Sequence, residues 1–313
     1  MASSAAFALA VFTFLGSQQV IRAESYTFTP VSLPPGIGGE LEGINDSGQI
    51  VGSFLDGVHP YQGFLYDHGT FSVVDFPGAY MTQVQGINNS GQMIGSYGVH
   101  GFLYSGGMFT SIDFPGGVTT EPLAINNAGI IAGNYLGSDD TFHGFLYNHG
   151  VFSSVSTPLA TGFVVDGIND SGQILGHQGI LNPDGTFTPL HVPGSAIASK
   201  FGFNNAGLAV GSYSDSSGLG HGFLYNDGVF TTVDVPGATL PYGTFSIPAI
   251  NNQNQIVVDA NLGMGNPGIF LGVPTETPEP GSFLLAAAGL LCGVGCGFRR
   301  RRSRNCSTEI GTP

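Results

Sequence analysis

Three histidines stand at the same place in a recurring motif. His100, His143 and His221 each come directly before a Gly-Phe-Leu-Tyr sequence. Imidazoles can ligate a metal ion or transfer protons. Equivalent positions of different repeats lie a repeat or more apart, however, so these side chains can share an ion only if they line a common channel. The repetition favours a structural role, in which each imidazole bonds a backbone group, and we predict no metal site.

The acidic residues give a similar result. Asp75, Asp113 and Asp234 occupy one repeat position, which favours a structural role, whereas Asp139-Asp140 and Asp215 lie in longer loops that could border a cleft. Glycoside cleavage needs two carboxylates about 5–10 Å apart in such a cleft. We find no Gly-x-Ser-x-Gly elbow between a strand and a helix. We therefore predict no catalytic residue and no cofactor.

The elements that would position these side chains come from a repeated unit. Its first motif is an apolar residue followed by Asn-Asx and, in most copies, a Gly two residues later. Six copies start 43, 38, 43, 35 and 47 residues apart, at Gly43, Gly86, Ala124, Gly167, Gly202 and Ala249.

Each copy of this motif is typical of a strand, a tight turn and a second strand. Asn and Asp side chains bond the nearby backbone in turns, and Gly accepts the positive φ that a tight turn needs. Calcium binding is the alternative, but a calcium loop uses several carboxylates at alternate positions, and most copies have Asn there. We expect structural turns. His68 and His149 fall in Asp-His-Gly and Asn-His-Gly turns and are expected to be exposed.

Two further motifs complete the repeat. The Gly-Phe-Leu-Tyr strand begins at Gly63, Gly101, Gly144 and Gly222, with weaker copies at Gly179 and Gly268. The third motif is a strand that ends in Pro-Gly, as in Phe71 to Gly78, with echoes beginning at Phe109, Phe152, Phe187 and Phe230.

One repeat supplies four short strands in about 40 residues, the size of a propeller blade. In the third motif Phe109, Ser111 and Asp113 face one way, while Ile112 and Phe114 face the other. Both faces of the strand therefore carry apolar bulk, as a blade packed between two neighbours requires.

The ends of the array indicate how it closes. A sixth copy of the third motif stands alone at Phe28 to Gly36, whereas the last repeat, Ala249 to Leu271, lacks that strand. The opening strand can thus complete the last blade. We predict an all-β fold in which residues 24–272 form a six-bladed β-propeller closed by the N-terminal strand. The alternatives are a solenoid and a pair of β-sandwiches. An open solenoid would require polar caps at its ends.

Charge and cysteine separate this body from the ends of the chain. Lys200 is the only basic residue between Arg22 and Arg299, and of the 21 acidic residues only Glu309 follows the arginine cluster. So acidic a surface repels phosphate backbones, and we expect no nucleic-acid partner. All three cysteines lie in the tail, which leaves the body without disulfides or thiolate metal ligands.

The first 23 residues resemble a secretion signal. An apolar run from Ala5 to Leu15 is followed by polar residues and by Ala23, where cleavage could fall. No Lys or Arg precedes the run, which departs from the usual pattern. The alternative is a buried strand or helix of the domain.

The C-terminal end has three parts. A Pro-rich linker, residues 273–280, contains Pro278, Glu279 and Pro280; an apolar segment covers 281–298; and a basic tail covers 299–313. As a helix the apolar segment would span about 27 Å, close to the hydrocarbon thickness of a bilayer. We predict one C-terminal transmembrane helix. Its C-terminal end faces the cytoplasm, because four arginines follow it: Arg299, Arg300, Arg301 and Arg302.

This tail closely resembles the PEP-CTERM sorting signal of Gram-negative bacteria. The resemblance implies that Pro278, Glu279 and Pro280 are recognised by an exosortase, a membrane transpeptidase that cleaves nearby. The chain would then sit transiently in the inner membrane before it is attached at the cell surface or released. The segment Ser303 to Pro313 is longer than is usual after the arginines. A permanent single-span anchor is the alternative.

The three repeat motifs together, over Phe28 to Leu271, resemble the HAF-repeat family of bacterial extracellular proteins. That resemblance implies surface export and a repeat fold, without an activity. We therefore expect a non-enzymatic surface or matrix protein that binds a glycan or a protein in exopolysaccharide or biofilm. The alternatives are a lyase or glycosidase acting on polysaccharide, since propellers also carry enzymes, and a structural component without a defined ligand.

Overall fold

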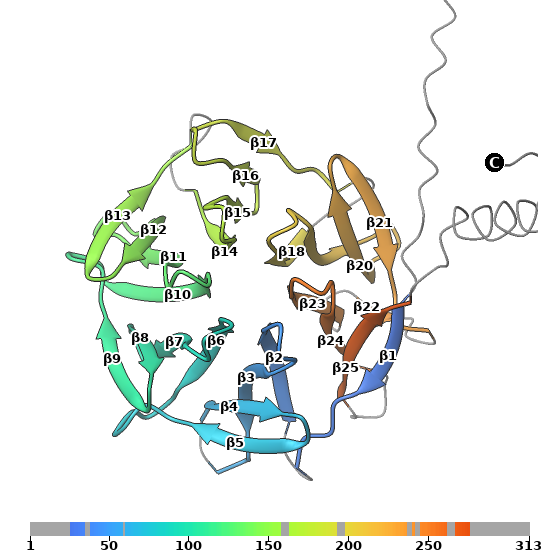
Figure 1. The fold of residues 1–313 in the computed structure, drawn as a ribbon, viewed down its shortest axis with the longest axis horizontal. Coiled ribbons are helices and arrows are strands. Elements are labelled where there is room, and N and C mark those ends of the chain that lie inside the picture. The colour runs from blue at the N-terminus through green and yellow to red at the C-terminus, as the bar shows by residue number, and fades with distance from the viewer. Residues whose placement is uncertain are drawn as a thin grey trace, which may run out of the picture. The chain divides into compact units, whose positions relative to one another are not determined.

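The computed structural model describes residues 26–34, 38–58, 60–157, 163–192, 198–236, 240–241, 245–261 and 267–275. The regular structure in these ranges is β-strand, and the strands form six antiparallel sheets arranged as blades around a central axis (Figure 1). The predicted six-bladed propeller is confirmed. The predicted signal peptide, 1–23, and tail helix, 281–298, lie outside the described residues. Within the described part, no helix is long and apolar enough to span a bilayer.

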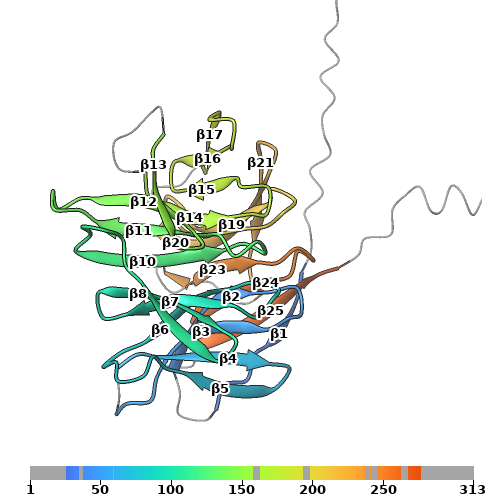
Figure 2. The ribbon, with the colours of Figure 1, turned by 60° about the vertical axis from the view of Figure 1, so that its left-hand side comes forward.

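Each blade is a meander that runs outward from the axis (Figures 1 and 2). Blades 1 to 3 are built from β2 (Gly38–Ile44), β3 (Ile50–Leu55), β4 (Gln62–Asp67) and β5 (Thr70–Val74); β6 (Gln83–Ile87), β7 (Met93–Tyr97), β8 (His100–Ser105) and β9 (Met108–Ile112); and β10 (Thr119–Ile125), β11 (Ile131–Leu136), β12 (Phe142–Asn148) and β13 (Val151–Val155). Blades 4 to 6 are built from β14 (Val165–Ile168), β15 (Ile174–Gly176), β16 (Gly179–Leu181) and β17 (Phe187–Pro189); β18 (Ala198–Phe203), β19 (Ala209–Ser214), β20 (Leu219–Asn226) and β21 (Val229–Val233); and β23 (Phe245–Ile250), β24 (Ile256–Asn261), β25 (Pro267–Pro274) and β1 (Tyr26–Pro30). A short strand, β22 (Leu240–Pro241), adds to β20 in blade 5.

The core lies between the blades. Phe109 packs with Phe102 against blade 1, whereas Ile112 and Phe114 pack with Phe145 against blade 3. This arrangement confirms that the fourth strand carries apolar side chains on both faces. The rings of the Gly-Phe-Leu-Tyr motif are almost wholly buried: Phe64, Phe102, Phe145 and Phe223 are at most 1% exposed. Burying each such ring stabilises the fold by roughly 1.5–3 kcal/mol.

The first strand of each blade contains a bulge just before the conserved turn motif, for example between Leu41 and Gly43. Opposite the bulge the chain needs glycine, because a Cβ at Gly52 would collide with the backbone oxygen of Glu40. The bulge re-aims the end of the strand toward the axis. It thereby places the Asn-Asx turns of the six blades close together.

The ring closes as the sequence predicted. β1 pairs antiparallel with β25, with Phe28 opposite Gly272 and Pro30 opposite Phe270. The amide of Val31 continues this pairing by donating to the carbonyl of Ile269 at 2.8 Å. We call the place where β1 and β25 meet, and where blade 6 adjoins blade 1, the seam.

Two of the weaker motif copies are aligned differently from the prediction. In blade 1 Leu65 lies opposite Val51, and the pairing places Ile180 and Leu271 at the position of Leu65. Gly179 and Gly268 are therefore each one position away from the glycine of the motif. In blade 4 Gly179 takes the place of the buried phenylalanine, and Phe163, from the segment before β14, supplies the ring, at 1% exposure.

Candidate functional site

The turns nearest the axis are closed by their first asparagine. Asn45 is 3% exposed, and its Oδ1 accepts hydrogen bonds from the amides of Ser47 and Gln49 at 3.1 and 3.0 Å. Gly48 completes the turn at φ 75°. The asparagine oxygen is thus turned toward its own backbone, which confirms the predicted structural turn.

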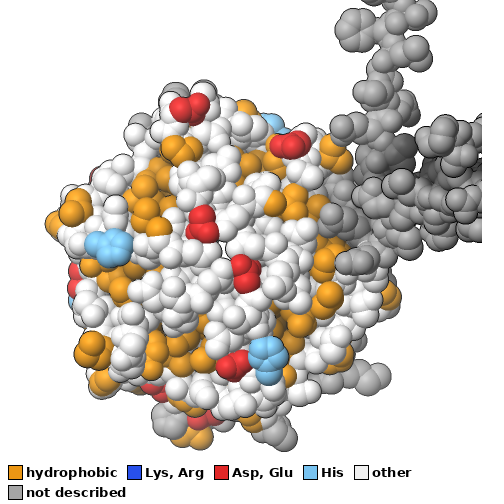
Figure 3. Space-filling model, viewed as in Figure 1, with side chains coloured by type: hydrophobic (Ala, Val, Ile, Leu, Met, Phe, Trp, Pro, Cys, Tyr) orange, Lys and Arg blue, Asp and Glu red, His pale blue; other side chains and the backbone are white. Residues whose placement is uncertain are grey.

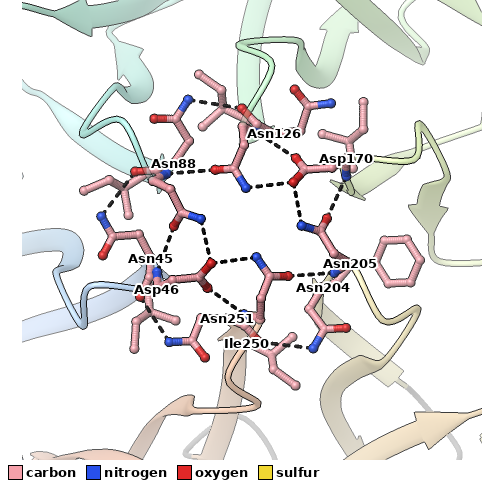
Figure 4. A pocket seen from close by; sticks show the side chains of 17 residues that line it. Asn45, Asp46, Asn88, Asn126, Asp170, Asn204, Asn205, Ile250 and Asn251 are labelled. Atoms are coloured by element: carbon pink, nitrogen blue, oxygen red, sulfur yellow. Dashed lines mark hydrogen bonds between the residues drawn. The ribbon is translucent and has the colours of Figure 1, made fainter.

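These asparagines also bind one another's turns in a closed circle, and five of the six are labelled in Figure 4. The side-chain amide of each donates to the backbone carbonyl of the equivalent asparagine in the next blade, and the last donates to the first. In order the donors are Asn45, Asn88, Asn126, Asn169, Asn204 and Asn251, at 3.0 to 3.3 Å. We call this the asparagine ring, and the face of the propeller that carries these turns the asparagine face.

The next residue of each turn forms a second circle of bonds nearer to solvent. Its two aspartates, Asp46 and Asp170, come from opposite blades, and their carboxylates accept from asparagine side chains on both sides. Asp46 also accepts from the backbone amide of Asn252 at 2.8 Å. Both carboxylates are thus satisfied by donors from the neighbouring turns. The described residues contain no group of three or more His, Cys, Asp or Glu side chains that could hold a metal ion.

The axial channel is narrow. Six apolar residues form a collar across it, namely Ile44, Ile87, Ile125, Ile168, Phe203 and Ile250. The cavity on the asparagine side of this collar has a volume of about 80 Å³ and the one on the other side about 90 Å³. A water occupies about 30 Å³ in the liquid. Each cavity has room for waters and is well below the roughly 300–1,000 Å³ of small-ligand sites.

The second of these cavities is lined by Asp166, whose carboxylate pairs with the imidazole of His177, and the sequence did not indicate this pair. Asp166 is 11% exposed, and its Oδ2 lies 2.9 Å from Nδ1 of His177. Burial raises the pKa of Asp166, and its carboxylate in turn raises the pKa of His177. Shifted pairs of this kind occur in active sites and in structural networks alike. Here the carboxylate faces the small cavity, whereas the His177 side chain is 47% exposed.

The three motif histidines lie in different blades, as expected, but their partners differ from the prediction. Instead of a backbone group, each imidazole contacts a carboxylate. His100 contacts Asp113 at 3.0 Å, His143 contacts Asp139 at 3.1 Å, and His221 contacts Asp234 at 2.9 Å.

These imidazoles belong to small aromatic stacks. Each lies 5.2 Å from the ring of a tyrosine on the neighbouring strand, as His100 does from Tyr97. In blades 2 and 3 the other face of the tyrosine stacks on a phenylalanine from the preceding blade. Phe76 lies 3.7 Å from Tyr97, and Phe114 lies 3.6 Å from Tyr135.

The repeated aspartates have the predicted structural role. Oδ1 of Asp75 accepts from the amide of Gly63 at 3.3 Å, and Oδ1 of Asp234 accepts from that of Gly222 at 3.2 Å. In blade 1 Gln62 takes the place of the histidine and donates to Asp75 at 3.0 Å. These carboxylates therefore tie the start of the third strand to the end of the fourth.

His221 lies between two carboxylates and should titrate above its ordinary range. Desolvation lowers its pKa, but Asp234 and Asp215, at 2.9 and 3.6 Å, outweigh it and raise the pKa overall. A raised folded-state pKa contributes stability that is fully present below about pH 6.5 and is lost as the pH rises through the folded value. We expect NMR titration of the His221 ring protons to give a pKa above 6.5, and Asp234→Asn to bring it down.

The matched control for this titration is Asp227→Asn. It removes the same charge from blade 5, in the turn between β20 and β21. If Asp227→Asn lowers the pKa of His221 as much as Asp234→Asn, the shift comes from overall charge and the local explanation is wrong.

A larger cavity than the two in the channel lies on the asparagine face at the seam, with a volume of about 330 Å³. It lies between blade 6 and blade 1, and we call it the seam pocket. Its lining includes Thr29 of β1, Leu271 of β25, Tyr66 of blade 1 and Gln255 of blade 6. Its volume lies at the lower end of the range for small-ligand sites, roughly 300–1,000 Å³.

The surface around these sites is acidic. On the face seen in Figure 3, acidic side chains are scattered from the centre to the rim, and no lysine or arginine is visible among the described residues. Exposure of the two turn histidines is confirmed: the His68 side chain is 72% exposed, and His149 is also exposed. The predicted sorting residues, Pro278, Glu279, Pro280 and Arg299 to Arg302, lie outside the described residues.

Comparisons with known proteins find no matching family model and no curated relative. Solved structures with some similarity include a complex of YCF48 with a D1 peptide, at 14% identity and a TM-score of 0.45, covering 77% of this chain and 80% of that one. PorZ, a surface component of the type-IX secretion system of Porphyromonas gingivalis, has 14% identity and a TM-score of 0.40, covering 81% and 44%. The six-bladed lectin of Aleuria aurantia has 10% identity and a TM-score of 0.33, covering 78% and 79%. The assignment of this chain as a six-bladed propeller therefore rests on its own strand pairing.

Proposed function

We propose that this chain is an exported, non-enzymatic protein of the cell surface or extracellular matrix that binds a glycan or a protein through one face of its propeller. Export and sorting are inferred from the two chain ends, which resemble a secretion signal and a PEP-CTERM signal. An exosortase-type enzyme would act at Pro278, Glu279 and Pro280 while the chain is held in the inner membrane.

One observation carries the binding role. The acids and histidines of the repeat contact side chains and amides of their own blades, whereas the seam pocket lies open on one face. These contacts give the repeated acids and histidines a structural role within their blades. An open pocket of ligand size on this face is suited to hold a partner.

The second candidate is an enzyme acting on polysaccharide. The Asp166–His177 pair favours it, because both pKa values are raised and proton transfer needs such groups. The cavity that Asp166 lines, about 90 Å³, is well below the roughly 300–1,000 Å³ of small-ligand sites. We therefore place this candidate second.

Incubation of the protein with the producer's exopolysaccharide separates the two functions. The protein is purified from cells and medium, and its intact mass is measured first, with both ends expected to be removed. We expect the polymer to retain the protein with no change in its chain length.

New reducing or unsaturated ends would instead show an enzyme. A mass that includes the whole tail would contradict sorting but not binding. If neither the immobilised polymer nor an immobilised fraction of surface proteins retains the protein, the proposed binding function is wrong.

A further inference from the structure

The seam breaks the repeat symmetry in the connection between the third and fourth strands of a blade. In blades 1 to 5 a turn joins the third strand to the fourth, as His68-Gly69 joins β4 to β5. In blade 6 these strands are β25 and β1, which come from opposite ends of the propeller. Blade 6 therefore has no such turn, and whatever the turn supplies elsewhere is missing here.

In three blades the residue at which the third strand enters this turn is an acceptor for a glutamine. Gln49, Gln92 and Gln173 follow the asparagine-ring residue by four positions. Their side-chain amides donate to the residue at the end of the third strand, at 3.1, 3.3 and 2.7 Å; these acceptors are Asp67, Ser105 and Asn182 respectively. The bond holds the glutamine against the turn in each of these blades.

Gln255 of blade 6 occupies the same position with a different outcome. Its Oε1 accepts from Asn251 at 2.7 Å, as Gln49 accepts from Asn45 at 2.8 Å. The strand pairing, however, places Val273 where the other blades have their acceptor. Among the described residues the amide group of Gln255 has no acceptor, and Gln255 lines the seam pocket.

Two further groups complete the polar side of the pocket. His68 holds Asp67 through Nδ1 at 2.6 Å, which leaves its Nε2 for another partner. Thr29 adds a hydroxyl. The Tyr66 ring and Leu271 form the apolar wall.

The chemistry of this lining selects a class of ligand. Asp46 also lines the pocket, but the side chains of Asn89 and Asn252 already occupy its carboxylate, so it offers little to a cation. Lys200, the one lysine or arginine between Arg22 and Arg299, lies in β18 of blade 5. The lining of the pocket therefore has no lysine or arginine to balance the negative charge of an anionic ligand. An unpaired amide, an imidazole nitrogen and hydroxyls beside an aromatic ring match a neutral ring that carries several hydroxyl groups.

We propose that the seam pocket binds a neutral sugar residue of a glycan, with Gln255 donating to a sugar hydroxyl and Tyr66 covering the apolar face of the ring. The inference rests on the proposed binding function and names its ligand and its site. It also gives the broken symmetry a function: in blade 6 a hydroxyl of the ligand accepts the hydrogen bond from Gln255 that a protein side chain accepts from the glutamine of blades 1, 2 and 4.

The test measures retention of the full chain on immobilised dextran, mannan and galactan, with alginate as the acidic polymer. We expect retention on at least one neutral polymer, elution by the free monosaccharide of that polymer, and no retention on alginate. Gln255→Glu keeps the acceptor for Asn251 and removes only the donor, and it should weaken binding about tenfold, the equivalent of one hydrogen bond. His68→Asn, which tolerates the positive φ of 46°, should also weaken it.

The matched control is Gln92→Glu, the same change at the equivalent position of blade 2, which should leave binding unchanged. Thermal melting of each variant shows whether the fold is intact. Retention that survives both Gln255→Glu and His68→Asn overturns the seam pocket as the site and leaves the proposed function standing. If the unaltered chain binds none of the neutral polymers, the inference of a sugar ligand is wrong. Specific capture of a surface protein would in that case still support the proposed binding function.

Discussion

Deleting β1, residues Tyr26–Pro30, is expected to leave the propeller unable to close. Blade 6 would lose its outer strand, and with it the side chains of Tyr26 and Phe28, which pack against the core between blades 5 and 6. The backbone of β25 would become an unpaired edge, and such edges recruit other chains. We expect loss of the cooperative unfolding transition, or aggregation, measured by circular dichroism on heating and by size-exclusion chromatography.

A circular permutant gives the matched control. Tyr26 lies opposite Pro274, so a short turn after Thr275 can lead directly into residues 26–34 and make the sixth blade a continuous meander like the other five. This chain contains the same strands in another order and should melt cooperatively. If the deleted chain melts at the same temperature as the permutant, the closing strand does not stabilise the ring.

Asn88→Ala is expected to destabilise the propeller by about 2–4 kcal/mol. The asparagine is 3% exposed. Its Oδ1 accepts from the amides of Ser90 and Gln92, and its amide donates to the carbonyl of Asn126 at 3.1 Å. Alanine leaves the amides of Ser90 and Gln92 without this acceptor, whereas the carbonyl of Asn126 keeps its bond from the amide of Gly129. A buried group left unpaired costs about 1–3 kcal/mol. Chemical denaturation measures the loss as a lower free energy of unfolding.

The neighbouring residue provides the comparison. Asn89→Ala removes exposed bonds to Asp46, which water can replace, and should cost less than about 1 kcal/mol. Equal losses for Asn88→Ala and Asn89→Ala would show that the asparagine ring contributes no more to stability than the outer circle of bonds.

The repeat motifs were sufficient to predict the blades and their closure, because turn residues and alternating strands are local properties of a sequence. Phe28 could be matched to Phe71 by eye, and β1 indeed completes the last blade. The weaker copies at Gly179 and Gly268 were misaligned by one residue, since a single glycine does not determine register. The register is determined by the pairing with the neighbouring strand. In blade 4 it also depends on the ring of Phe163, which comes from the segment before β14.

The candidate site was much less accessible from the sequence. The six asparagines were identified as turn residues, but their bonds to one another depend on blades that lie 35 to 47 residues apart in the chain. The Asp166–His177 pair breaks the repeat pattern and left no signal in it. The seam pocket could be anticipated in part: a chain that ends its array in mid-blade must lack one turn there, and Gln255 is the glutamine that this turn would have bonded.

The pairing of β1 with β25 also sets the timing of folding. A polypeptide is synthesised from its N-terminus, so the first strand of the propeller is made before any other and its partner after all the rest. Until residue 274 has emerged, the nascent chain is an open arc with two unpaired edges. The propeller can close only after β25 has been synthesised, immediately before the residues that resemble a sorting signal.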